Sequence, residues 1–133
     1  IPVVLAAITK HKRHEGVQEY GCDVLANLAF DDDNVAAIAA AGGIPAVLSA
    51  IKAHTGQVKV QASGCRALTH LSGNADNKKK IAAAGGIPLV LEVMITHQRH
   101  QVVQEAGCGM LANLASDDDN ESAAIAAAGG IPV

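Results

Sequence analysis

The chain has 133 residues, half of them apolar, and its formal net charge at pH 7 is −3. A weak negative charge does not favour nucleic acid or an anionic membrane as a partner, so neither is expected. No apolar run approaches the roughly 18 residues that span a bilayer. The apolar residues are mostly Ala, Val, Ile and Leu, with no Trp, one Tyr and one Phe. This composition suits closely spaced helices better than an aromatic ligand site.

One stretch, Ala-Ala-Ala-Gly-Gly-Ile-Pro, occurs three times, at 39–45, 82–88 and 126–132. The copies are 43 and 44 residues apart, and Ile1-Pro2 lies one further period upstream. A fixed period of this size predicts a solenoid of stacked helical units. We therefore expect one domain over 1–133, with repeats at about 1–43, 44–86 and 87–130 and a fourth beginning at 131.

Each repeat is expected to begin with a helix that starts at its proline. The glycine pair should end the preceding helix in a left-handed conformation, and proline is favoured at the first helical position. The three helices are predicted from Ile1-Pro2, from Pro45 to about His54 and from Pro88 to about His97.

The longest helix of each repeat follows, with apolar residues at helical spacing over about 17–30, 58–72 and 102–116. A glycine occupies one equivalent position inside each of these helices. Because a mid-helix glycine costs about 0.5–1 kcal/mol relative to alanine, three in register predict a close approach by a neighbouring helix. These residues are Gly21, Gly64 and Gly107.

The three cysteines are also repeat equivalents, at Cys22, Cys65 and Cys108. Stacked helices lie about 8–10 Å apart, which is too far for a disulfide between equivalent positions. We expect small buried packing residues with reduced thiols, and hence an intracellular protein, cytoplasmic or nuclear.

A short helix should complete each repeat and end in the triple alanine. Its start is expected to be capped by a turn carrying Asp33-Asn34, Asp76-Asn77 or Asp119-Asn120. The extra residue of the third repeat falls near Glu121-Ser122.

The string Val-Gln-Glu-Tyr-Gly-Cys-Asp-Val-Leu-Ala-Asn-Leu-Ala (17–29), together with the short helix and Ala-Gly-Gly-Ile-Pro, resembles an armadillo repeat. It is most similar to the long armadillo arrays of unicellular eukaryotes. This resemblance implies an all-α, right-handed solenoid (superhelix) of three armadillo repeats, each with three helices. It also implies a protein-binding scaffold without catalytic activity.

In the armadillo family the long helices line a concave groove, and an Asn on each helix holds the backbone of an extended peptide. The matching positions here are Asn27, His70 and Asn113, so a histidine interrupts the row. The resemblance places Asp23, Arg66 and Gly109 where importin-like members carry Trp, which argues against a basic import signal as the ligand. It also places Glu19, Tyr20 and Glu105 in the groove. We expect Arg66 to form an ion pair with Asp23 in the adjacent repeat.

The leading hypothesis is therefore an extended peptide or other protein partner bound along this groove. The alternatives are a structural unit that associates head to tail, and a segment of a longer array. For the head-to-tail alternative, we expect one exposed face around Val4 and Leu5 and a complementary face around Leu111, Leu114 and Ile125.

The histidine and aspartate clusters do not suggest a metal or another cofactor. His11-x-x-His14 and His97-x-x-His100 lack the further ligands of a four-ligand site. Asp31–Asp33 and Asp117–Asp119 lack the spacing of a calcium loop. No nucleophile elbow, phosphate-binding glycine loop or zinc-protease motif is present, so no enzyme is expected.

Overall fold

The computed structural model describes residues 1–116 and 125–127. This part of the chain contains helices and no strand. The helices are α1 (Pro2–Lys10), α2 (Glu15–Leu28), α3 (Asp32–Ala40), α4 (Gly43–Ala53), α5 (Val58–Leu71), α6 (Ala75–Ala83), α7 (Gly86–Thr96) and α8 (Gln101–Ala115). The predicted third short helix, with Asp119-Asn120 and the extra residue, lies outside the described residues.

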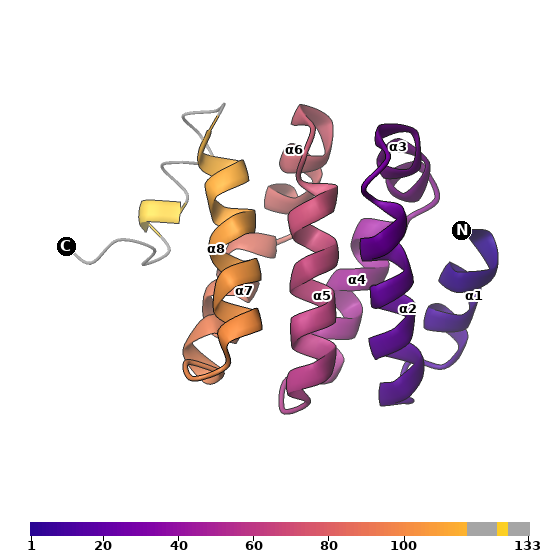
Figure 1. Cartoon of the computed structure of the whole chain (residues 1–133), viewed down its shortest axis with the longest axis horizontal. Coiled ribbons are helices and arrows are strands. Elements are labelled where there is room, and N and C mark those ends of the chain that lie inside the picture. The colour runs from indigo at the N-terminus through magenta and orange to yellow at the C-terminus, as the bar shows by residue number, and fades with distance from the viewer. Residues whose placement is uncertain (117–124, 128–133) are drawn as a thin grey trace.

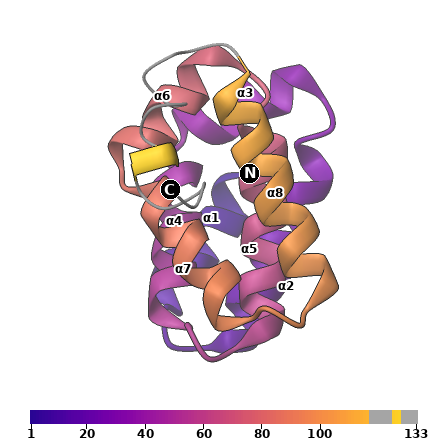
Figure 2. The ribbon, with the colours of Figure 1, turned by 90° about the vertical axis from the view of Figure 1, so that its left-hand side faces the viewer.

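The long helices α2, α5 and α8 lie side by side in one layer, with α5 packed between the other two (Figure 1). The first helices of the repeats, α1, α4 and α7, lie behind them, as the turned view shows (Figure 2). The short helices α3 and α6 lie at one end of the long helices (Figure 1). Each layer is thus built from equivalent helices of successive repeats, and the all-α solenoid is confirmed.

The glycine pairs separate the repeats as expected. Gly42 and Gly85 have φ of 89° and 82°, the left-handed region in which glycine avoids the strain of a Cβ. The next helix then begins at the second glycine, Gly43 or Gly86. Pro45 consequently occupies the third helical position instead of the first. No hydrogen bond is lost there, because the first N–H groups of a helix have no intrahelical acceptor.

The three mid-helix glycines allow the first helix of each repeat to approach the long helix closely. A Cβ on Gly64 would lie 2.6 Å from Ile51 Cγ1, and one on Gly21 would lie 2.6 Å from Ile8 Cγ1. At Gly107 the nearest atom is Met94 Sδ, at 2.5 Å. The predicted close approach is confirmed, and it occurs within each repeat.

A glutamine near the start of each long helix holds the end of the preceding helix. Gln61 Nε2 donates to the carbonyl oxygens of Ile51 and His54, at 3.1 and 2.6 Å. Gln18 and Gln104 make the equivalent pairs of bonds. The Ile51 carbonyl lies in the last turn of α4, where an α-helix leaves carbonyls without an intrahelical donor. The His54 carbonyl also accepts from the Gln57 N–H.

The caps of the short helices differ from the prediction. Asp31 and Asn74 are the N-caps, and their side chains accept from the backbone N–H of Asp33 and Asn77. Asn77 Nδ2 instead donates backwards, to the carbonyl of Leu71 at the end of α5. Asn34 does the same for Leu28. The side-chain amide thus joins the long helix to the short one that follows.

The turn histidines join successive repeats. His54 Nε2 lies 2.7 Å from the carbonyl oxygen of Lys12, and His97 Nε2 lies 2.8 Å from that of Thr55. Each contact connects a turn to the equivalent turn of the preceding repeat. His14 and His100 act locally, because Nδ1 of each accepts from a backbone N–H as the N-cap of α2 or α8.

The cysteines do not all behave as predicted. Cys22 and Cys65 are fully buried, whereas Cys108 is exposed. The two cysteines occupy equivalent positions, but α5 packs on α2, whereas no described long helix follows α8. The prediction of a buried cysteine is therefore wrong for Cys108.

No single helix in the described part of the chain is long and apolar enough to cross a membrane. The pair α3 and α4 meets the length and composition criteria only jointly, with a bend of 74° between the two helices.

Candidate functional site

Apart from Tyr20, the predicted site residues lie on the outer side of the three long helices. We call this side the long-helix surface and define it by residues that are exposed or half-buried. They are Glu19, Asp23 and Asn27 on α2, Arg66 and His70 on α5, and Glu105, Gly109 and Asn113 on α8. The two-layer fold creates this surface, because the opposite side of each long helix packs on the first helices.

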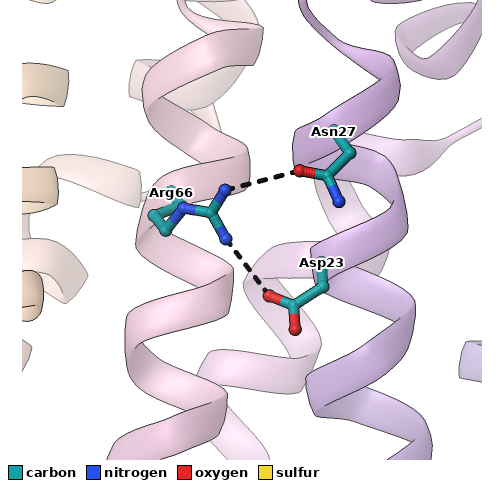
Figure 3. Close-up of polar contacts among 3 residues, drawn as sticks. All are labelled: Asp23, Asn27 and Arg66. Atoms are coloured by element: carbon teal, nitrogen blue, oxygen red, sulfur yellow. Dashed lines mark hydrogen bonds and ion pairs between the residues drawn. The ribbon is translucent and has the colours of Figure 1, made fainter.

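The predicted ion pair is present. Arg66 Nη1 lies 3.3 Å from Asp23 Oδ1, and Arg66 Nη2 donates to Asn27 Oδ1 at 3.5 Å (Figure 3). The Arg66 and Asp23 side chains remain 36% and 32% exposed, so water weakens the pair. Arg66 therefore spans the gap between α5 and α2 and brings three of the predicted residues together.

The Asn113 side chain also forms hydrogen bonds within the molecule, but as a donor, whereas Asn27 accepts. Its Nδ2 donates to the carbonyl oxygen of Thr69 and to Ser72 Oγ, both at 3.0 Å. The Asn113 donors are thus used and its Oδ1 is left to accept. At Asn27 the oxygen is used and Nδ2 is left to donate. The two asparagines therefore offer opposite hydrogen-bonding groups to a ligand.

His70 lies between these asparagines and packs on Phe30. The two rings have centroids 4.5 Å apart and planes tilted by 49°. Partial burial and the neighbouring Arg66 charge lower the pKa of His70 from its ordinary value of 6.5. A neutral imidazole carries one donor and one acceptor, so His70 continues the row of polar side chains.

Phe30 was not predicted as a site residue. It is 73% exposed at the end of α2 and is the single Phe of the chain. Its equivalents in the other repeats are Gly73 and Ser116, so the repeat pattern does not predict an aromatic residue there. The available signal was an aromatic residue at the expected end of an amphipathic helix.

A cleft of about 490 Å³ lies between α5 and α8 on the long-helix surface. Arg66, Thr69 and His70 line it from α5, and four α8 residues complete the lining: Val102, Glu105, Ala106 and Gly109. Because Gly109 has no side chain, the space that Arg66 fills in the preceding gap stays open here.

Tyr20 is not part of this cleft. It is 67% exposed and lies in an apolar depression at the side of α1 and α2, with Val3, Val4 and Val24. Glu19 and Glu105 form no ion pair within the described residues. The structure therefore groups Asp23, Asn27 and Arg66 together and places Tyr20 apart from them.

The described side chains contain no group of three His, Cys, Asp or Glu placed to hold a metal ion. Burial raises the pKa of the Cys22 and Cys65 thiols to about 12. The long-helix surface offers hydrogen-bonding groups, charges and a cleft for a ligand.

These features define a helical-repeat scaffold of the armadillo class. The family model of the LRRK2 ARM repeat matches residues 1–122, so the chain belongs to this armadillo-repeat family. A solved structure described as an engineered protein, a target of the Northeast Structural Genomics Consortium, is similar in fold, with a TM-score of 0.84 and 24% sequence identity. The match covers 97% of this chain and 51% of that one. No curated protein sequence matches the chain significantly.

Proposed function

We propose that the chain is a non-enzymatic scaffold that binds an extended peptide segment of a partner protein along the long-helix surface, in the cytoplasm or nucleus. The observation that carries the proposal is the row of polar side chains across three repeats. Asn27 offers donors, Asn113 offers an acceptor, and His70 lies between them. An extended backbone presents alternating N–H and C=O groups that such a row can pair.

The charges of the surface favour a ligand of mixed charge. Asp23 neutralises part of the Arg66 charge, while Glu19 and Glu105 are acidic without an ion-pair partner among the described residues. A strongly basic peptide would be repelled by the positive charge of Arg66 at the centre of the row.

An array of mixed-charge, polybasic and neutral peptides tests this proposal, followed by NMR of the isotope-labelled protein. We expect mixed-charge peptides to bind best and to shift the side-chain amide resonances of Asn27 and Asn113. Asn27→Ala should weaken binding, whereas Gln98→Ala, in an exposed turn away from this surface, should not. A clear preference for polybasic peptides, or shifts confined to other surfaces, would contradict the proposal.

Self-association is a second candidate function, and the burial of equivalent positions favours it. Val60, Ser63 and Ala67 of α5 are buried against α2, whereas their α2 equivalents include Tyr20 and Val24, which are exposed. On α8, Cys108 and Ala112 are exposed although their equivalents in α2 are fully buried. A second copy could pair these two faces as the internal repeats do.

The residues expected for these faces were partly wrong. Leu5, Leu114 and Ile125 are buried in the core, and Leu111 is half-buried against it. Light scattering over a dilution series tests self-association. An oligomer that Tyr20→Lys converts to a folded monomer would support it, and a monomer at high concentration would contradict it.

A further inference from the structure

Neighbouring long helices are separated by two gaps, one between α2 and α5 and one between α5 and α8. Equivalent positions beside these two gaps carry different residue types. In the gap between α2 and α5, Arg66 is the donor, and Asp23 and Asn27 are the acceptors. One repeat later, the positions of Asp23 and Asn27 are held by Arg66 and His70. The position of Arg66 is held by Gly109.

The gap between α5 and α8 therefore contains donors, and Gly109 offers no side chain to pair with them. Glu105 lines the same cleft but forms no ion pair with Arg66. Arg66 has five N–H donors, and its two contacts to α2 are long, at 3.3 and 3.5 Å. Guanidinium N–H groups thus remain for a ligand, beside the imidazole of His70. Both residues line the 490 Å³ cleft that Gly109 leaves open.

The charged groups around the cleft come from all three long helices. Arg66 provides a positive charge, Asp23 on α2 pairs with it from one side, and Glu105 lies on the α8 wall. Val102 and Ala106 supply apolar contact on that same wall. A cationic side chain entering beside Arg66 and His70 would be repelled. An acceptor there would complete the arrangement seen in the first gap.

We propose that this cleft binds the carboxylate of an acidic side chain, Glu or Asp, of an extended peptide, through Arg66 and His70. The inference rests on the proposed peptide-binding function and identifies one ligand residue. Arginine and carboxylate form charge-assisted hydrogen bonds with matching planar geometry. A bound carboxylate also favours the imidazolium form of His70, so its pKa should rise when the peptide binds.

Three otherwise identical peptides test the proposal by fluorescence anisotropy. They are a C-terminally amidated peptide with one central Glu, the same peptide with Gln, and the Gln peptide with a free C-terminal carboxylate. We expect the Glu peptide to bind about three- to tenfold more tightly than the amidated Gln peptide, as for a partly exposed charged hydrogen bond. Tighter binding of the free-carboxylate Gln peptide than of the Glu peptide would overturn the assignment to a side chain.

Two variants of the cleft then locate the effect. Arg66→Gln removes the charged donor, and Gly109→Asp supplies an internal acceptor, so each should abolish the preference for Glu. A Cβ on Gly109 would lie 3.0 Å from Thr69 Cγ2, so a small adjustment is needed and the fold should be checked by circular dichroism. The matched controls are Lys52→Gln and Gly56→Asp, which make the same charge changes at exposed positions outside this surface.

The outcomes separate this inference from the proposed function. Binding of both amidated peptides with shifts at Asn27 and Asn113, but without preference for Glu, would overturn only the carboxylate assignment. If both Arg66→Gln and Gly109→Asp still prefer the Glu peptide, the carboxylate assignment is overturned as well. If none of the peptides shifts the long-helix surface, the proposed function fails with it. An NMR titration in which the His70 midpoint rises on binding the Glu peptide, and not the Gln peptide, would support it.

Discussion

At the scale of single residues, each repeat places a glycine and a cysteine side by side under different constraints. Gly64 faces the buried Ile51 at a distance that leaves no room for a Cβ, whereas Cys65 already occupies a small buried space. Substitutions at the glycine are thus limited by the close approach of the neighbouring helix, and substitutions at the cysteine are limited by side-chain volume.

Gly64→Val should therefore destabilise the protein by about 2–3 kcal/mol, because overpacking forces side chains and backbone to move. Cys65→Val changes volume only slightly and should cost less than about 1.5 kcal/mol. Urea denaturation followed by circular dichroism measures both. If Gly64→Val has the same midpoint as the parent, the close packing between α4 and α5 is not limiting.

The thiols should differ in reactivity. Desolvation by burial, with a contribution from Asp23, raises the pKa of Cys22 to about 12, and burial raises that of Cys65 to about 12. Thiolate is the reactive form, so both should resist alkylation at pH 8 in the folded protein, while the exposed Cys108 reacts. Mass spectrometry after brief iodoacetamide treatment should show one modified cysteine per chain, and none in Cys108→Ser.

The sequence predicted some residue contacts and not others, for geometric reasons. The Asp23–Arg66 pair follows from the repeat spacing, because equivalent positions on adjacent long helices lie side by side. The bond of Asn113 to the Thr69 carbonyl depends on the Asn113 rotamer. Its bond to Ser72 also depends on a hydroxyl that only the second repeat carries at that position. The exposure of Cys108 depends on which helix covers α8, and residue spacing does not determine that.

At the scale of elements, the end of each first helix depends on a side chain from the next helix. Gln61 is fully buried and supplies donors to two carbonyls, while its own Oε1 has no partner among the described residues. The glutamine also recurs every 43 residues. That recurrence is visible in the sequence, but the acceptors are backbone atoms that residue types do not reveal.

Gln61→Leu should cost about 1–3 kcal/mol, chiefly through the unpaired carbonyl of Ile51, since that of His54 keeps its bond from the Gln57 N–H. Removal of the unpaired oxygen offsets part of this cost. Gln61→Glu should cost more at pH 7, because it buries a charge beside two carbonyl oxygens. Thermal unfolding measures the order of the two variants. Equal losses would show that the donated hydrogen bonds contribute little.

Behind the long helices, the joint between the first and second repeats contains smaller side chains than the joint between the second and third. A crevice of about 220 Å³ lies between α1 and α4 and is lined by Ala46, Ala50 and Ala53, among others. In α7 the equivalents are Leu89, Val93 and Thr96, which are larger. The contact between α1 and α4 is therefore built with smaller residues than the equivalent contact of α7.

Ala46→Leu, which copies Leu89, should stabilise the protein by about 1 kcal/mol through buried methylene groups. The corresponding rise in melting temperature is about 4 °C for a domain of this size. Ala36→Leu, at an exposed position of α3, serves as the control and should have little effect. A lower melting temperature for Ala46→Leu would show that the crevice does not accept the larger side chain.

At the scale of the whole molecule, contacts run between neighbouring repeats, so stability should vary along the chain. The central helix α5 packs on α2, α4 and α8, whereas α1 packs on α2 and α4. The period and the glycine–proline punctuation were sufficient to predict this architecture. The cleft was not predictable in the same way, because it arises from one glycine in a position where the other repeats carry Asp and Arg.

Hydrogen exchange measured by mass spectrometry should reveal this gradient. We expect the amides of α5 to exchange most slowly and those of α1 most rapidly, because repeat proteins open from their less contacted parts. Gly64→Val should accelerate exchange in α4 and α5. Uniform protection of α1 and α5 would indicate that the described repeats unfold as one cooperative unit.

The contacts of His54 and His97 have a consequence for how such a chain can lengthen. The second repeat carries both halves of the bond, His54 for the turn before it and the Thr55 carbonyl for the turn after it. Since every residue has that carbonyl, the acceptor survives any substitution at Lys12 or Thr55 that keeps the turn. A tandem duplication of residues 44–86 would therefore inherit this connection complete on both sides of the added copy, so growth by gene duplication needs no new compensating mutation at this edge.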